Sequence, residues 1–260
     1  MDELDLDGWA GRLASCLQDS VGRSLAGADE AAVAFSGGLD SSVVALLVSR
    51  RLERTTMYTV GLSGAKDLLM SKLGAEVLGL RERLVRLEVG ENEVLAAANA
   101  ILGLLPDCRP VEVAFLIPSY LVLVHARERT VFTGDGADEL FGGYHRYLAM
   151  EPPRLAASLE ADTRRLLGTG IQRNRMLARS AGKELATPFL DDSVVELGLS
   201  IPPEHKVAGG QRKLVLRRAA ELLGVPGDVS NLPKAAAQYS SSVMKVLRKH
   251  PELFAVGKRV

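Results

Sequence analysis

The sequence predicts an α/β fold, in which a parallel, twisted sheet carries helices on both faces and is followed by a mostly helical C-terminal region. Short strand-like runs alternate with segments of helical periodicity over the first 145 residues. Two of those runs end in glycine-rich turns, and after Pro152-Pro153 the pattern becomes almost wholly helical. We therefore expect residues 1–150 to form an α/β core and residues 151–260 a helical annex, together one compact unit.

The first expected element is an amphipathic helix, because Trp9, Leu13, Leu17 and Val21 recur at helical spacing and Asp7 is available as an N-cap. Apolar and β-branched runs then predict four strands, at residues 31–35, 56–62, 84–89 and 130–133. Helical periodicity between them predicts helices at residues 43–52, 67–80, 91–105 and 118–127. The annex is expected to hold helices at residues 155–167, 172–181, 193–199, 211–223 and 241–248.

Composition narrows the function classes. Thirty-two basic and thirty-two acidic residues among 260 give zero formal net charge, so a nucleic-acid partner is not expected. The acidic N-terminus does not resemble a signal peptide, and no apolar run reaches the roughly 18 residues of a membrane span. Two cysteines, 92 positions apart, match neither a zinc site nor a disulfide scaffold. We expect a soluble, cytoplasmic protein without a membrane partner.

The first candidate site is the turn after the first strand. A loop between a buried strand and a helix N-terminus offers free backbone N–H groups and the positive end of the helix dipole, which suit phosphate. An aspartate beside phosphates is explained if it holds Mg²⁺. The alternative is an ordinary turn in which this aspartate caps the helix. The segment reads Ser36, Gly37, Gly38, Leu39, Asp40, Ser41 and Ser42.

The second candidate site follows the fourth strand. Asp135, Asp138 and Glu139 lie within five residues, bracketed by glycines, and like charges this close favour a bound cation or cationic ligand. The alternative is a solvated acidic loop.

Both segments resemble a known family. Ser-Gly-Gly-Leu-Asp-Ser-Ser is similar to the pyrophosphate loop of the N-type ATP pyrophosphatases, which cleave ATP between the α and β phosphates. Gly-Asp-Gly-Ala-Asp-Glu-Leu-Phe-Gly-Gly-Tyr, at residues 134–144, resembles the corresponding segment of the asparagine synthetase and β-lactam synthetase family. Further matches in the same order are residues 59–62 with Asp67, 188–191, 213–217, and Lys234 before residues 238–240.

The resemblance implies roles by position. Asp40 and Asp138 would bind Mg²⁺, residues 36–42 would cradle pyrophosphate, and Asp135 and Lys234 would be catalytic. Asp135 stands where the family has a glutamate that is one methylene longer. Lys213 and Arg217, four apart on one helix face, are open to either phosphate binding or packing. The residues expected to border adenosine are Ala34, Val60, Thr133 and Gly134.

Two features differ from the family. Full asparagine synthetases begin with a glutaminase domain whose nucleophile is a cysteine after the initiator methionine, whereas this chain reads Met1-Asp2. We therefore expect nitrogen from ammonia, from an amine, or from a separate glutaminase subunit. In the segment that recognises aspartate, the family arginine becomes Ala114, with Pro118 fixing the register. Glu112 in that segment is open to meeting a cationic substrate group or to simple solvation.

The implied function is ATP-dependent amide formation, in which a carboxylate is activated as an acyl-adenylate, with AMP and pyrophosphate as products, and is then passed to ammonia or an amine. We expect aspartate to be a poor substrate and the true carboxylate to be larger or more apolar. Two alternatives remain open at this point: a tRNA- or nucleobase-modifying ATP pyrophosphatase, and a subunit that binds ATP without turnover.

Overall fold

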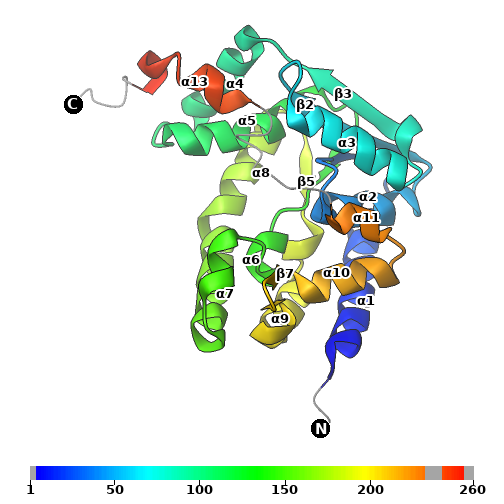
Figure 1. Ribbon diagram of the computed structural model, residues 1–260. Coiled ribbons are helices and arrows are strands. Elements are labelled where there is room, and N and C mark those ends of the chain that lie inside the picture. The colour runs from blue at the N-terminus through cyan, green and yellow to red at the C-terminus, as the bar shows by residue number, and fades with distance from the viewer. Residues whose placement is uncertain (1–3, 232–241, 255–260) are drawn as a thin grey trace.

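The computed structural model describes residues 4–231 and 242–254 and is built around one five-stranded parallel sheet (Figure 1). The strand order is β3-β2-β1-β4-β5, so the direction of strand addition reverses between β1 and β4. Parallel α/β sheets bind ligands at this kind of switch point, beyond the carboxyl ends of the strands. The strands are β1 Glu30–Ala34, β2 Arg54–Gly61, β3 Leu84–Glu88, β4 Thr130–Phe132 and β5 Glu184–Ala186.

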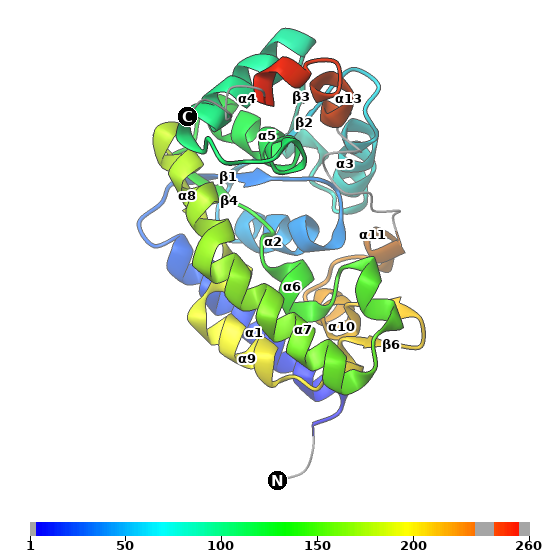
Figure 2. The ribbon, with the colours of Figure 1, turned by 90° about the vertical axis from the view of Figure 1, so that its left-hand side faces the viewer.

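Helices cover both faces of the sheet, because alternate residues of its strands point to opposite sides. On β1, Ala31 and Val33 enter one apolar core, and Ala32 enters the other. Figure 2 shows the two helical layers above and below the sheet. The first core packs under α1 Leu6–Ser24, α2 Leu39–Ser49, α3 Lys66–Val77, α9 Asp192–Ser200 and α10 Leu214–Leu222. The second packs under α4 Glu91–Leu104, α5 Pro110–His125, α8 Ile171–Ser180 and α13 Val243–Leu247.

Shorter elements frame the carboxyl end of the sheet. The helix α6 follows β4, α7 runs through a π turn into α8, and α11 packs beside α2 and α3. A hairpin, β6 with β7, leads directly into α10. Their bounds are α6 Ala137–Phe141, α7 Pro152–Arg165, the π turn Leu166–Gly170, β6 Val207–Ala208, β7 Gln211–Arg212 and α11 Gly227–Asn231. Single 3₁₀ turns occupy Arg81–Arg83, His145–Ala149, Pro188–Leu190, Pro203–His205 and Pro251–Phe254.

The N-terminal helix is held by late parts of the chain. Helix α1 packs against α9 and α10. The Ser20 hydroxyl donates to the Pro188 carbonyl (3.0 Å), and Arg23 pairs with Asp191 (2.7 Å). Asp7 pairs with Arg218 of α10, so the predicted N-cap role of Asp7 is wrong: the cap is Asp5, which accepts from the Gly8 N–H at 2.8 Å.

The α/β fold class is confirmed, and the four expected strands are β1 to β4. The expectation that the C-terminal region is almost wholly helical missed three short strands. One of them, β5, pairs with β4, so the two sequence regions share one sheet. In the part of the chain that the structure describes, no helix has the length and apolar character needed to cross a bilayer.

The helix expected at residues 118–127 is wrong in its start, because α5 begins at Pro110. Proline suits the first turn of a helix, and the Glu112 carboxylate caps that turn by accepting from the Arg109 N–H (2.9 Å). Pro118 therefore lies inside the helix, where it cannot donate a hydrogen bond to the carbonyl of residue 114.

Candidate functional site

The glycine loop, residues 36–42, consists of the turn after β1 and the first turn of α2, and it is shaped by close contact with α3. Gly37 has φ 76°, and a Cβ there would lie 2.3 Å from the Met70 carbonyl oxygen. A Cβ on Gly74 of α3 would lie 2.8 Å from the Gly37 Cα. Both positions therefore require glycine, and the loop is packed directly on the backbone of α3.

The serines of the glycine loop differ in what their hydroxyls do. The Ser41 hydroxyl donates to the Gly38 carbonyl (3.1 Å) and accepts from the Ser36 N–H (3.2 Å), while Ser36 is exposed. Ser42 is fully buried, and its hydroxyl has no hydrogen-bond partner among the described residues. This geometry gives no support to a phosphate contact from Ser42.

The acidic loop, residues 133–144, separates its three carboxylates. Asp135 accepts from Thr133 and from Asn174 of α8, each at 3.0 Å. Asp138 pairs with Lys213, and Glu139 accepts from the Tyr144 hydroxyl at 2.5 Å. Burial raises the pKa of both Asp135 and Glu139. Over residues 4–231 and 242–254, no three potential metal ligands gather around one point, so the sequence cluster is not a spatial one.

Asp40 and Asp138 nevertheless converge, because the two loops lie side by side at the switch point. A Cβ added to Gly134 would come within 3.0 Å of the Asp40 Cβ. The Lys213 Nζ lies 2.6 Å from Asp40 Oδ1 and 2.5 Å from Asp138 Oδ1. Two carboxylate oxygens from different loops thus contact the same ammonium group, that of Lys213. Paired carboxylate oxygens of this kind are also the ligands that Mg²⁺ takes in proteins.

Lys213 reaches this position from the segment that joins β7 to α10. It precedes α10 as the N-cap, with φ 59°, so the expectation that it shares a helix face with Arg217 is wrong. Arg212 donates to the Gly143 carbonyl (2.6 Å). A Cβ on Gly143 would clash with Asp138 Oδ1 and with the Lys213 side chain, so glycine there lets the basic segment lie on the acidic loop.

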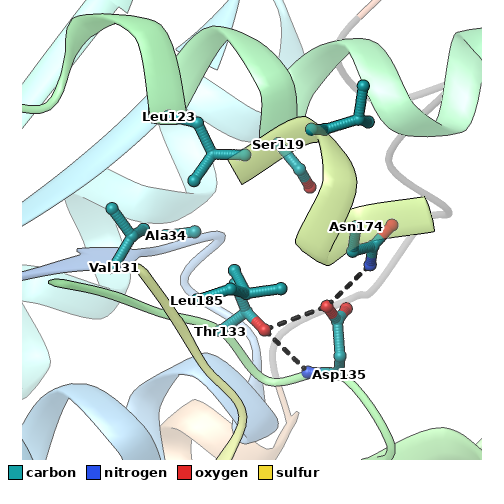
Figure 3. A pocket seen from close by; sticks show the side chains of 9 residues that line it. Ala34, Ser119, Leu123, Val131, Thr133, Asp135, Asn174 and Leu185 are labelled. Atoms are coloured by element: carbon teal, nitrogen blue, oxygen red, sulfur yellow. Dashed lines mark hydrogen bonds between the residues drawn. The ribbon is translucent and has the colours of Figure 1, made fainter. Parts of the chain in front are cut away.

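The opposite side of the acidic loop faces α5 and α8. Figure 3 shows Asp135 turned toward Asn174, with Ser119 of α5 nearby. A cavity of about 10 Å³, enough for one water-sized molecule, lies among these groups. Its remaining lining is mostly apolar: Ala34, Leu123, Val131, Thr133, Leu177 and Leu185.

Two residues of the segment expected to recognise the carboxylate substrate do not face a ligand. Ala114 has no exposed surface and belongs to the second core, so an arginine there would enter the core. Glu112 is bound by the Arg109 backbone and side chain and by Arg173 (2.9 Å). These contacts, first the Arg109 N–H, lower the pKa of Glu112 to about 2. Glu112 was open to meeting a cationic substrate group, but Arg109 and Arg173 of the chain itself already occupy that position.

The other expected site residues are dispersed more widely. Ala34 and Thr133 lie together at the ends of β1 and β4, beside Gly134. Val60 lies near the end of β2, where it is 3% exposed in the second core. Lys234 lies outside the described residues.

Sequence reasoning missed Asn174, Arg173 and Arg212. Asn174 and Arg173 belong to a helix whose sequence shows only amphipathic spacing. That spacing does not predict the contact of Asn174 with Asp135, which lies 39 residues earlier in the sequence. Arg212 was a better candidate, because it stands directly before Lys213 in a segment already matched to the family.

The chain is similar in sequence to proteins of one known family. The sequence profile of the asparagine synthase family matches residues 12–157 and 152–254. A Methanocaldococcus jannaschii protein named "Putative asparagine synthetase (glutamine-hydrolyzing) 1" is 30% identical over 284 residues, covering 94% of this chain and 51% of that protein. Human asparagine synthetase (glutamine-hydrolyzing) is 27% identical over 236 residues, covering 84% and 42%. The structure of NMN synthetase from Francisella tularensis aligns with TM-score 0.48 and 13% identity, covering 98% of this chain and 93% of that one.

The parallel sheet, with a glycine loop and a carboxylate pair at its switch point, defines an α/β protein whose candidate site lies at the carboxyl ends of β1 and β4. The chain belongs to the asparagine synthase family. It spans about half the length of the curated relatives that it matches.

Proposed function

We propose that this chain is an ATP-dependent amide-forming ligase that activates a carboxylate as an acyl-adenylate. The observation that carries the proposal is that the carboxylates of Asp40 and Asp138 converge beside the glycine loop, where both contact the ammonium of Lys213. Family membership supports a ligase of this general kind. The two loops would bind ATP and Mg²⁺, with Asp40 and Asp138 as the metal ligands. Mg²⁺ would supply charge neutralisation on the phosphates of the bound nucleotide.

The chain's own groups would divide the reaction between them. The N-terminus of α2 and the glycine-loop N–H groups would hold the β and γ phosphates, with Lys213 close enough to compensate their charge. The substrate carboxylate would attack the α-phosphorus, and the bond to the bridging oxygen would break to release pyrophosphate. The amine would then attack the acyl carbon, AMP would leave, and the amine would lose a proton.

Asp135 would act on the second half of this reaction. It lies on the α5–α8 side of the acidic loop, where Thr133 and Asn174 fix its carboxylate and burial raises its pKa. A carboxylate with a raised pKa is suited to exchanging a proton with an amine or to stabilising the positive charge that the amine develops. Lys234 is proposed, on the family resemblance alone, to stabilise charge on the phosphates.

The carboxylate substrate is proposed to be larger or more apolar than aspartate. The register that supplies an arginine in the family puts the buried Ala114 here. The side chains of α5 that line the cavity beside Asp135 are Ser119 and Leu123. Ammonia or an amine, supplied freely or by a separate glutaminase, is the proposed nitrogen donor, and a cytoplasmic location is proposed with it.

The test is ATP–pyrophosphate exchange over a panel of carboxylates, with the nucleotide product identified after addition of ammonia or an amine. Exchange that depends on one carboxylate class, with AMP as product, supports the proposal. ADP as product would contradict it. Exchange that depends on RNA instead would indicate a nucleobase-modifying enzyme, and ATP binding without exchange for any substrate would indicate a non-catalytic subunit. Efficient turnover of aspartate at millimolar concentration or below would overturn the substrate proposal alone.

A further inference from the structure

The side chain of Lys213 lies between the two carboxylates that are proposed to hold the metal. Its Nζ is 2.6 Å from Asp40 Oδ1 and 2.5 Å from Asp138 Oδ1, and the residue is 6% exposed. A Mg²⁺ ion bound to the same two oxygens would lie at about 2.0–2.1 Å from each. The ammonium and such an ion cannot both occupy this position.

We propose that Lys213 and the divalent cation compete for the carboxylate pair, so that the site takes up metal together with a phosphate ligand and only weakly without one. This inference rests on the proposed function for its metal site. It adds to that function a coupling between the binding of metal and the binding of phosphate, which depends on the side chain of Lys213.

The backbone around Lys213 is fixed, so competition would move only its side chain. The Lys213 carbonyl accepts from the Arg217 N–H (2.8 Å), and the next residue, Leu214, donates to the Lys206 carbonyl (3.0 Å). Arg212 is tied to the Gly143 carbonyl on the other side. The left-handed conformation of Lys213, with φ 59°, is an unfavourable one for a non-glycine residue.

The displaced ammonium would need another anionic partner. Leaving a buried ammonium unpaired is strongly unfavourable, so a metal ion that enters alone has to overcome that loss. Asp40 belongs to the glycine loop, at the N-terminus of α2, and a phosphate bound to that loop would accept the ammonium. Metal and phosphate would therefore strengthen each other's binding, by the same factor in both directions.

The experiment measures Mn²⁺ binding to the full chain by electron paramagnetic resonance, with and without pyrophosphate. In the wild type we expect weak Mn²⁺ binding that tightens at least about tenfold when pyrophosphate is present. Lys213→Met should bind Mn²⁺ alone at least about tenfold more tightly than the wild type, with most of the coupling to pyrophosphate lost. Lys213→Arg, which keeps the positive charge, should behave like the wild type.

Two further variants make the result specific. Lys206→Met removes another buried lysine of the same segment, one that makes no ion pair with a described carboxylate, and should leave Mn²⁺ affinity unchanged. Lys213→Met combined with Asp138→Asn should lose the tight Mn²⁺ binding. Circular dichroism would confirm that each variant is folded.

The possible failures are distinguishable. Equal Mn²⁺ affinity in the wild type and in Lys213→Met, with loss in Asp138→Asn, would overturn the competition and keep the metal site. Absence of Mn²⁺ binding in folded Lys213→Met, even with pyrophosphate, would overturn the metal assignment and the competition together. The Mn²⁺ measurements do not depend on turnover, so an inactive chain that shows the expected coupling supports the competition while the exchange assay rejects the proposed reaction.

Discussion

The two sides of the candidate site are built by different means. The glycine loop is positioned by backbone contacts, with Gly37 against the Met70 carbonyl and Gly74 against Gly37. The α5–α8 side is positioned by side chains on helices that are far apart in the sequence, such as Asn174 on Asp135 and Arg173 on Glu112. A motif of short range therefore predicts the first side, whereas the second side depends on contacts between distant helices, which no such motif encodes.

The largest effect is expected from removing the charge of Asp40 on the glycine-loop side. Asp40→Asn keeps the shape of the side chain and removes one of the two charges that converge on Lys213. If Asp40 binds the metal, AMP formation should fall by about 10²-fold or more. The measurement is the rate of pyrophosphate release at saturating ATP. Asp29→Asn, an exposed position at the amino end of the sheet, should retain full activity. Undiminished activity in Asp40→Asn would remove the metal assignment.

The second prediction separates packing from backbone strain in the glycine loop. Gly37 and Gly27 have almost the same φ, 76° and 77°, but only Gly37 would place a Cβ against another backbone. Gly27→Ala should lower the free energy of unfolding by about 1 kcal/mol, through strain alone. Gly37→Ala should lower it by a further 1–3 kcal/mol or so, through the clash with α3. Urea denaturation of the two variants measures the difference, and equal losses would show that the contact with α3 does not fix the loop.

The third prediction concerns the α5–α8 side and the pH dependence of turnover. Asn174 donates to the ionised Asp135, so its hydrogen bond opposes the effect of burial on the pKa of that carboxyl. Asn174→Ala should raise the pKa of Asp135 further. If the ionised form is the active one, the acid limb of the pH–rate profile should move to higher pH, with the KM for ATP unchanged. Gln172→Ala, an exposed change on the same helix, is the matched control. An unshifted acid limb would show that Asp135 does not control the rate.

The smallest expected effect compares two helix caps. Glu112 and Glu93 cap α5 and α4 in the same way, each accepting a backbone N–H at 2.9 Å, but only Glu112 also binds two arginines. Glu112→Gln should lower the free energy of unfolding at pH 7 by about 1 kcal/mol, since water screens this partly exposed group, and Glu93→Gln by less.

The stabilisation by Glu112 should depend on pH. Because the pKa of Glu112 is lowered from 4.5 to about 2, its stabilisation is complete above pH 4.5 and is lost as the pH falls toward 2. The difference in urea midpoint between the wild type and Glu112→Gln should therefore shrink as the pH falls from 7 through 4.5 to 3. A constant gap across this range would show that charge on Glu112 does not stabilise the cap.

Much of the fold and half of the site could be predicted from the sequence, because the signals are local. Strand-like runs, helical periodicity and the glycine turns indicate β1 to β4 and place the two loops at the same edge of the sheet. By contrast, β5 has only three residues, Glu-Leu-Ala, without a β-branched side chain. The positions of Lys213 and Asn174 depend on how distant helices pack, and no local pattern encodes that. Ala114 shows the same limit, because its burial results from the early start of α5 at Pro110, which the sequence did not predict.

The packing of α1 against α9 and α10 has a consequence for how this protein is made. The apolar stripe of α1, which includes Leu13, Leu17 and Val21, is synthesised well before α10, which begins at residue 214. At translation rates of about 5–20 residues per second, the stripe stays uncovered by α10 for roughly 10–40 s. During that interval the nascent chain is a ready target for chaperones or for aggregation. Lys213 is synthesised together with the start of α10, so a chain that stops before residue 213 carries both loops without the lysine that joins their carboxylates.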